Sequence, residues 1–168
     1  WVIRPGSVHR SLVSALPDGF LDRTLGRGLI VSWAPQLKVL AHPAVSCFLT
    51  HCGWNSVLES LSMGGVPMLC WPDMADQMVN RRLLVDVWRV GLEFRTPTKG
   101  HNEGIVDREE VEAVIRRLME SDEGRECGRR AGELRDLLLN AVKSDGSSAA
   151  NLHLFLERVH TLALASTQ

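Results

Sequence analysis

The chain has 168 residues, of which 45% are apolar, and this is enough for one core of domain size. Its 19 basic residues nearly balance its 20 acidic ones, so charge gives no reason to expect binding to nucleic acid or to an anionic membrane surface. No apolar run reaches the roughly 20 residues that span a bilayer. The four cysteines form no Cys-x-x-Cys pair, which favours a reduced, cytoplasmic protein over a disulfide scaffold.

Five short apolar runs predict β-strands, at residues 1–4, 29–33, 47–51, 67–71 and 91–94. The middle runs are almost continuously apolar, which is the pattern of strands covered on both faces. We therefore expect about five parallel strands. Because the first run begins at Trp1 itself, we also expect the chain to be a fragment of a longer protein.

Helical periodicity alternates with these strands and continues after the last of them. The expected helices cover residues 35–41, 55–63, 75–88, 111–119, 134–142 and 152–159. Asp107 with Glu110 three residues later predicts an N-cap, and residues 96–104 predict an exposed loop. The alternation predicts an α/β fold, a Rossmann-like parallel sheet in three layers with right-handed crossovers.

In such folds ligands bind at the carboxyl ends of the strands, which makes three strand–helix junctions the candidate site. The first junction is Trp33-Ala34-Pro35-Gln36. The Trp33 indole can stack on a planar ring, Ala34 offers backbone groups, and Gln36 offers a donor and an acceptor. The alternative is a core tryptophan at a strand end, followed by a proline at the first helical position.

The second junction runs from Thr50 to Glu59, through a glycine turn into a helix. A helix N-terminus of this kind binds anions, and His51 can add a hydrogen bond to a phosphate oxygen. The alternative is a helix cap, with Asn55 as N-cap or Ser56 and Glu59 as a capping box. A cap does not explain why His51 and Trp54 share the same turn.

The third junction ends in Asp76-Gln77, which offers two acceptors and an amide to adjacent sugar hydroxyls. The alternative is the ordinary preference for acidic residues in a first helical turn. A metal at Cys47, His51 and Cys52 is disfavoured because no fourth ligand follows at finger-like spacing. Phosphate-loop, dinucleotide-binding and hydrolase-elbow motifs do not occur in the sequence.

Together, residues 33–77 resemble the donor-binding signature of plant secondary-product UDP-glycosyltransferases. The stretch departs from the family pattern at one point, since it holds one extra residue near Gly64-Gly65. The residues that carry the resemblance are Trp33-Ala34-Pro35-Gln36, Leu40, His42, Phe48, Thr50-His51-Cys52-Gly53-Trp54-Asn55-Ser56, Glu59, Gly65-Val66-Pro67-Met68, Pro72 and Asp76-Gln77.

The resemblance implies that residues 1–168 are the C-terminal, donor-binding domain of a two-domain GT-B enzyme. The small-molecule acceptor and the catalytic base would belong to an absent N-terminal domain, so this chain would hold no catalytic residue and need no metal or other cofactor. Carried over by position, Trp33 stacks on uracil beside the Ala34 backbone, Gln36 and Glu59 hold the ribose, His51, Asn55 and Ser56 hold the diphosphate, and Trp54, Asp76 and Gln77 hold the sugar.

The implied activity is transfer of a sugar, expected to be glucose, from a UDP-sugar to a small hydroxylated acceptor with inversion at the anomeric carbon. The isolated chain is expected to be inactive. One alternative is a nucleotide-sugar-binding module without turnover, or half of a split enzyme. Another is a generic α/β signalling domain, which requires all three junctions to be structural coincidence.

Overall fold

The computed structural model describes residues 1–4, 6, 16–95 and 106–165. These residues form two compact units, Trp1–Val39 and Leu40–Gln168, and each unit is described by itself. The loop expected at residues 96–104 lies outside the described part of the chain.

In the first unit, the two predicted N-terminal strands meet at a single parallel bridge between Val2 and Val31. The Ile3 amide donates to the Val31 carbonyl, and the Val31 amide donates to the Trp1 carbonyl, both at 2.9 Å. The expectation of about five sheet strands is therefore wrong for the described residues. Trp1 and Leu29 are 68% and 74% exposed, so burial does not stabilise a longer ladder here. The unit also holds a short helix that was not expected, α1 (Phe20–Thr24).

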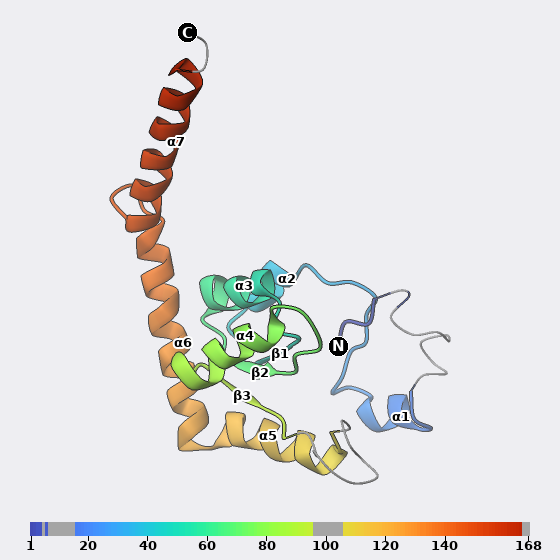
Figure 1. The fold of residues 1–168 in the computed structure, drawn as a ribbon. Coiled ribbons are helices and arrows are strands. Elements are labelled where there is room, and N and C mark those ends of the chain that lie inside the picture. Colours follow the sequence, from blue (N-terminus) through green and yellow to red (C-terminus); the bar gives the residue numbers. More distant parts are fainter. Residues whose placement is uncertain (5, 7–15, 96–105, 166–168) are drawn as a thin grey trace. The chain divides into compact units, whose positions relative to one another are not determined.

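The second unit is built on a parallel sheet of three strands in the order β1-β2-β3 (Figure 1). The strands are β1 (Phe48–Thr50), β2 (Met68–Cys70) and β3 (Gly91–Glu93). All three residues of the central strand β2 are buried, as its unbroken apolar run predicts. The register places Thr50 opposite Cys70, which aligns the ends of β1 and β2.

The helices follow the predicted order with different limits. They are α2 (Gln36–Leu40), α3 (Trp54–Gly64), α4 (Gln77–Arg82), the π-helical turn η2 (Leu83–Val87), α5 (Arg108–Glu120), α6 (Asp122–Ala141) and α7 (Ser147–Ala165). The Asp107 side chain accepts from the Glu110 amide at 2.8 Å, so the predicted N-cap is confirmed. Helix α6 begins well before residue 134, where the predicted helix starts. The prediction missed its first half because the residues buried there are small and carry little apolar signal: Gly124, Cys127 and Ala131.

Two apolar clusters lie on opposite faces of the sheet, since successive side chains of a strand point to opposite sides. Met68 and Cys70 belong to the first cluster, and Leu69 to the second. Helix α3 contributes Val57 and Leu61 to the first cluster. Helix α5 contributes Val114 and Leu118 to the second. The sheet is thus covered on both faces, and the predicted three-layer α/β fold is confirmed.

The corner between α5 and α6 requires glycine at position 124. A Cβ there would lie 1.9 Å from the Leu118 carbonyl oxygen, whereas a Cβ at Gly128 on the same helix would meet nothing within 4 Å. We expect Gly124→Ala to lower the free energy of unfolding by about 3 kcal/mol or more. Gly128→Ala should raise it by about 0.5–1 kcal/mol. Urea unfolding of both variants tests the contrast, and equal stabilities would contradict the close approach.

Helix α7 leads away from the sheet at the end of α6 (Figure 1). Apart from the half-buried Ala149, its described side chains are exposed, including apolar ones such as Phe155 at 60%. Within the described ranges, no helix is both long enough and apolar enough to cross a membrane.

Candidate functional site

The first junction leaves the Trp33 side chain accessible. Trp33 is 73% exposed, so the alternative of a core tryptophan is wrong. The Val39 amide donates to the Pro35 carbonyl at 3.0 Å, so Pro35 lies just before α2 and not at its first helical position. Gln36 opens α2. Trp33, Ala34 and Gln36 all belong to the first unit, and the other predicted site residues belong to the second.

The second junction turns sharply at Cys52, which has a left-handed backbone with φ of 66°. A non-glycine residue there carries strain of about 1–3 kcal/mol, and such strain collects at functional sites. The Thr50 hydroxyl accepts from the Cys52 amide at 3.2 Å. The Cys52 side chain is fully buried and directs its thiol toward the Thr50 carbonyl. The turn is therefore fixed by the strand that precedes it.

The His51 ring lies directly against Gly53. A Cβ built on Gly53 would lie 2.4 Å from His51 Nε2, so the ring occupies the space that any side chain at position 53 would take. Gly53 itself has an extended backbone with φ of −62°, which other residues adopt freely. Glycine is needed here for the position of the imidazole and not for its own backbone angles.

Helix α3 begins at Trp54, with Gly53 as its N-cap. Asn55 and Ser56 are therefore the second and third helical residues, and the alternatives of an Asn55 N-cap or a capping box from Ser56 to Glu59 are wrong. The reason is the left-handed Cys52, which starts the helix earlier. The first-turn amides of a helix have no acceptor within it, so the start of α3 is a candidate anion cradle.

The third junction is folded by the side chain of Gln77. Its Oε1 accepts from the amides of Asp73 and Met74, at 2.8 and 3.0 Å. The loop contains Ala75 in a left-handed conformation with φ of 55°. Asp76 is the N-cap position of α4 but makes no side-chain cap, so the ordinary preference for acids at a helix N-terminus stays an alternative.

One residue of this region, Asn80, was not expected from the sequence. Asn80 is 6% exposed, and its Nδ2 donates to the Cys52 carbonyl at 2.9 Å and to Asp76 Oδ2 at 2.7 Å. The signal in the sequence is a polar residue one helical turn after Asp76, at a position facing the core. The structure thus joins the second and third junctions through a buried amide.

Two buried thiols lie close together, Cys52 in the turn after β1 and Cys70 at the end of β2. A hydrogen bond with the Cys70 thiol lowers the pKa of Cys52 below its ordinary value. The same hydrogen bond is the main cause that raises the pKa of Cys70, and burial of the thiol is the second cause. All four cysteines are free thiols.

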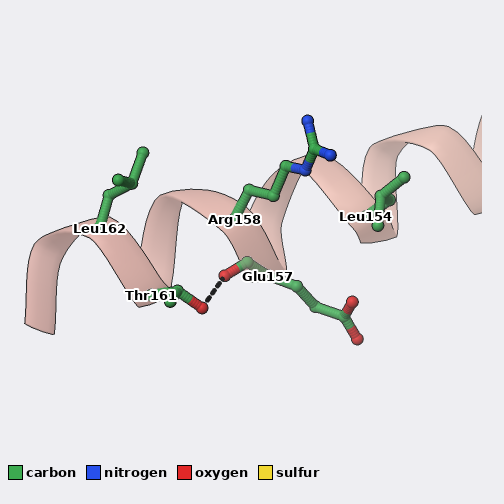
Figure 2. Close-up of a pocket in the computed structure, with 5 residues that line it drawn as sticks. All are labelled: Leu154, Glu157, Arg158, Thr161 and Leu162. Atoms are coloured by element: carbon green, nitrogen blue, oxygen red, sulfur yellow. Dashed lines mark hydrogen bonds between the residues drawn. The ribbon is translucent and has the colours of Figure 1, made fainter. Parts of the chain in front are cut away.

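Two surface hollows among the described residues, on α7 and on α5, offer no comparable chemistry. One is formed by a single face of α7, from Leu154, Glu157, Arg158, Thr161 and Leu162. Figure 2 shows that the charged groups of Glu157 and Arg158 point apart, while Thr161 donates to the Glu157 carbonyl at 2.9 Å. In the part of the chain that is described, no three His, Cys, Asp or Glu side chains are placed to hold a metal ion.

Comparison with known proteins gives consistent matches. The sequence model of one family, described as "UDP-glucoronosyl and UDP-glucosyl transferase", matches residues 13–109. UDP-glycosyltransferase 76C1 of Arabidopsis thaliana is 48% identical over 95% of this chain and 32% of its own length. Flavonol 3-O-glucosyltransferase UGT76E12 of the same plant is 47% identical over 96% of this chain and 34% of its own length.

Solved structures agree with the sequence matches. The apo structure of UGT2 from Phytolacca americana has a TM-score of 0.84 and 37% identity, over 94% of this chain and 36% of that one. UGT2 complexed with UDP-2fluoro-glucose and pterostilbene has a TM-score of 0.83 and 38% identity, over 94% of this chain and 34% of that one. The chain therefore spans about a third of the length of these relatives.

Proposed function

Because the chain belongs to this family of UDP-glucuronosyl and UDP-glucosyl transferases, we propose that it is the donor-binding domain of an inverting UDP-glycosyltransferase. The observation that carries the proposal is the turn after β1, where His51 lies against Gly53 at the start of α3. The chain spans about a third of the length of its relatives. Together with the family match, this supports a further domain that binds the acceptor. The proposed compartment is the cytoplasm, where the free thiols stay reduced.

In this proposal each junction keeps the role that the family resemblance implies for it. Trp33 stacks on uracil, which the exposure of its indole supports, while the Ala34 backbone also contacts the base. Gln36 and Glu59 accept the ribose hydroxyls. The diphosphate lies at the N-terminus of α3, with His51, Asn55 and Ser56 around it.

This arrangement favours departure of UDP. As the bond between the sugar C1 and the β-phosphate oxygen breaks, its electrons move onto that oxygen. The N-terminal end of α3 carries partial positive charge, and donors already aimed at a developing anion stabilise the transition state. The acceptor oxygen attacks C1 from the opposite side, which inverts the anomeric carbon, and its proton passes to a base outside this chain.

The sugar lies between Trp54 and the third junction. Asp76 accepts from sugar hydroxyls. Since the Gln77 carbonyl oxygen is bound to its own loop, Gln77 contributes its amide nitrogen as a donor. UDP-glucose is the proposed co-substrate, and UDP-glucose bound to UGT2 as its 2-fluoro analogue supports that choice.

Purified residues 1–168 test the proposal. We expect calorimetry to show UDP binding, and UDP-glucose to compete better than UDP-galactose or UDP-glucuronate. Incubation with UDP-glucose and phenolic acceptors should give no glucoside, because base and acceptor site are absent and each contributes orders of magnitude in rate. Absence of UDP binding would refute the donor site, and rapid glucoside formation would place the base within this chain.

The alternative of a nucleotide-sugar-binding module without turnover predicts the same UDP binding. The two proposals separate when the chain is joined to the N-terminal domain of a relative such as UDP-glycosyltransferase 76C1. An enzyme domain restores transfer in that chimera. A binding module leaves it inactive while UDP affinity is retained.

A further inference from the structure

The left-handed Cys52 is held from both sides by side-chain hydrogen bonds. On its amide side, the Thr50 hydroxyl accepts at 3.2 Å. On its carbonyl side, Asn80 Nδ2 donates at 2.9 Å. Since an unusual backbone conformation persists only where its surroundings fix it, these two bonds set the direction in which the following residues, Gly53 and Trp54, leave the turn.

The same Asn80 amide also reaches the third junction. Its second N–H donates to Asp76 Oδ2 at 2.7 Å, so one planar group fixes a backbone carbonyl and a carboxylate at a set separation. Asn80 is 6% exposed, so loss of its amide removes this donor from the buried end of the bond, at the Cys52 carbonyl. Asp76 itself is exposed, and this bond holds one oxygen of its carboxylate.

We propose that Asn80 is a positioning residue for the donor, which aligns the diphosphate turn at Cys52 with the sugar-binding carboxylate of Asp76. This inference rests on the proposed function, because it assigns a purpose to the alignment of those two junctions. Asn80 does not touch the donor. It acts through the Cys52 carbonyl and through Asp76.

Three variants of residues 1–168 test this role. Asn80→Asp keeps the shape but removes both donors and places a carboxylate beside Asp76. Asn80→Leu removes the donors without adding charge, and Asn80→Ser is the mildest change should the others not fold. Asn151→Asp, on the exposed start of α7, is the control with the same change of charge.

The expected result is a loss that depends on the phosphates. Asn80→Asp and Asn80→Leu should weaken UDP binding at least tenfold, while uridine, which lacks the diphosphate, should bind within twofold of the unchanged chain. Amide hydrogen exchange across residues 50–57 should become faster in both variants. The Asn151→Asp control should change none of these measurements.

A double variant identifies which of the two bonds matters for UDP. Asp76→Asn combined with Asn80→Asp restores a donor–acceptor pair between positions 76 and 80 but leaves the Cys52 carbonyl without its donor. UDP affinity should therefore stay low. Recovery of UDP affinity in this double variant would overturn the role of the bond to Cys52.

Other outcomes also decide the matter. Equal losses for UDP and uridine, or failure of all three Asn80 variants to fold, would assign Asn80 to the core and overturn the proposal. Unchanged exchange across residues 50–57 would do the same. If the unchanged chain bound no UDP, the donor-site function itself would fail, whereas the exchange measurement would still report whether Asn80 holds the turn.

Discussion

Gly53→Ala is expected to weaken UDP binding tenfold or more while leaving the chain folded. The new methyl group would lie 2.4 Å from His51 Nε2, so the imidazole has to leave its position beside the first turn of α3. The backbone of residue 53 has φ of −62°, which alanine adopts without strain. A hydrogen bond to a charged group contributes about 1.5–3 kcal/mol, and each 1.4 kcal/mol changes a dissociation constant about tenfold. Calorimetric titration with UDP measures the loss.

Comparison with His51→Ala shows whether the methyl group acts through the histidine. If it does, the combination of Gly53→Ala and His51→Ala should bind UDP no more weakly than His51→Ala alone, since both changes remove one interaction. Additive losses would mean that the methyl group acts on the turn directly. Gly128→Ala adds the same group where nothing lies within 4 Å and should leave UDP affinity unchanged.

Trp33→Ala should also weaken UDP binding about tenfold or more. Loss of a base stacked on an aromatic ring costs roughly 1–3 kcal/mol, and the indole is 73% exposed, so its removal disturbs little packing. The effect should be equally large for uridine, because the stack involves only the base. Competition titrations with UDP and uridine provide both values.

Trp1→Ala is the matched control for this stacking. Trp1 belongs to the same unit, is 68% exposed and has no proposed contact with the donor. Its removal should leave both affinities unchanged. A Trp33→Ala variant that bound uridine like the unchanged chain would show that the base lies elsewhere.

The fold was predictable wherever the sequence has an unbroken apolar run. The run at residues 67–71 is apolar throughout and became the buried central strand β2. The runs at 1–4 and 29–33 are also mostly apolar but pair through a single parallel bridge. Strand formation depends on neighbouring strands and on packing against other elements, and a local pattern contains neither. The first half of α6 escaped notice since its core contacts come from Gly124, Cys127 and Ala131.

The sequence indicated the residue types of the candidate site but not the hydrogen bonds that join them. The sequence placed His51 and Asp76 at separate strand ends, and their roles in binding remain predictions. It did not indicate that Asn80 joins those ends, because a buried side-chain bond across 28 residues leaves no periodic pattern. It also suggested caps at Asn55 and Ser56, since local spacing carries no information about the left-handed turn at Cys52.

The bond between Asn80 and Cys52 also has a consequence for the order of folding events. Its partners are separated by 28 residues, and α3 and β2 lie between them, so closing this loop costs entropy that is recovered only when those elements are in place. The turn should therefore acquire its shape after the transition state of folding. For substitutions at Asn80, the ratio of the change in folding activation free energy to the change in stability should then be near zero. Such substitutions should speed unfolding and leave the refolding rate almost unchanged. The anion cradle would then be among the last parts of the molecule to form and among the first to open.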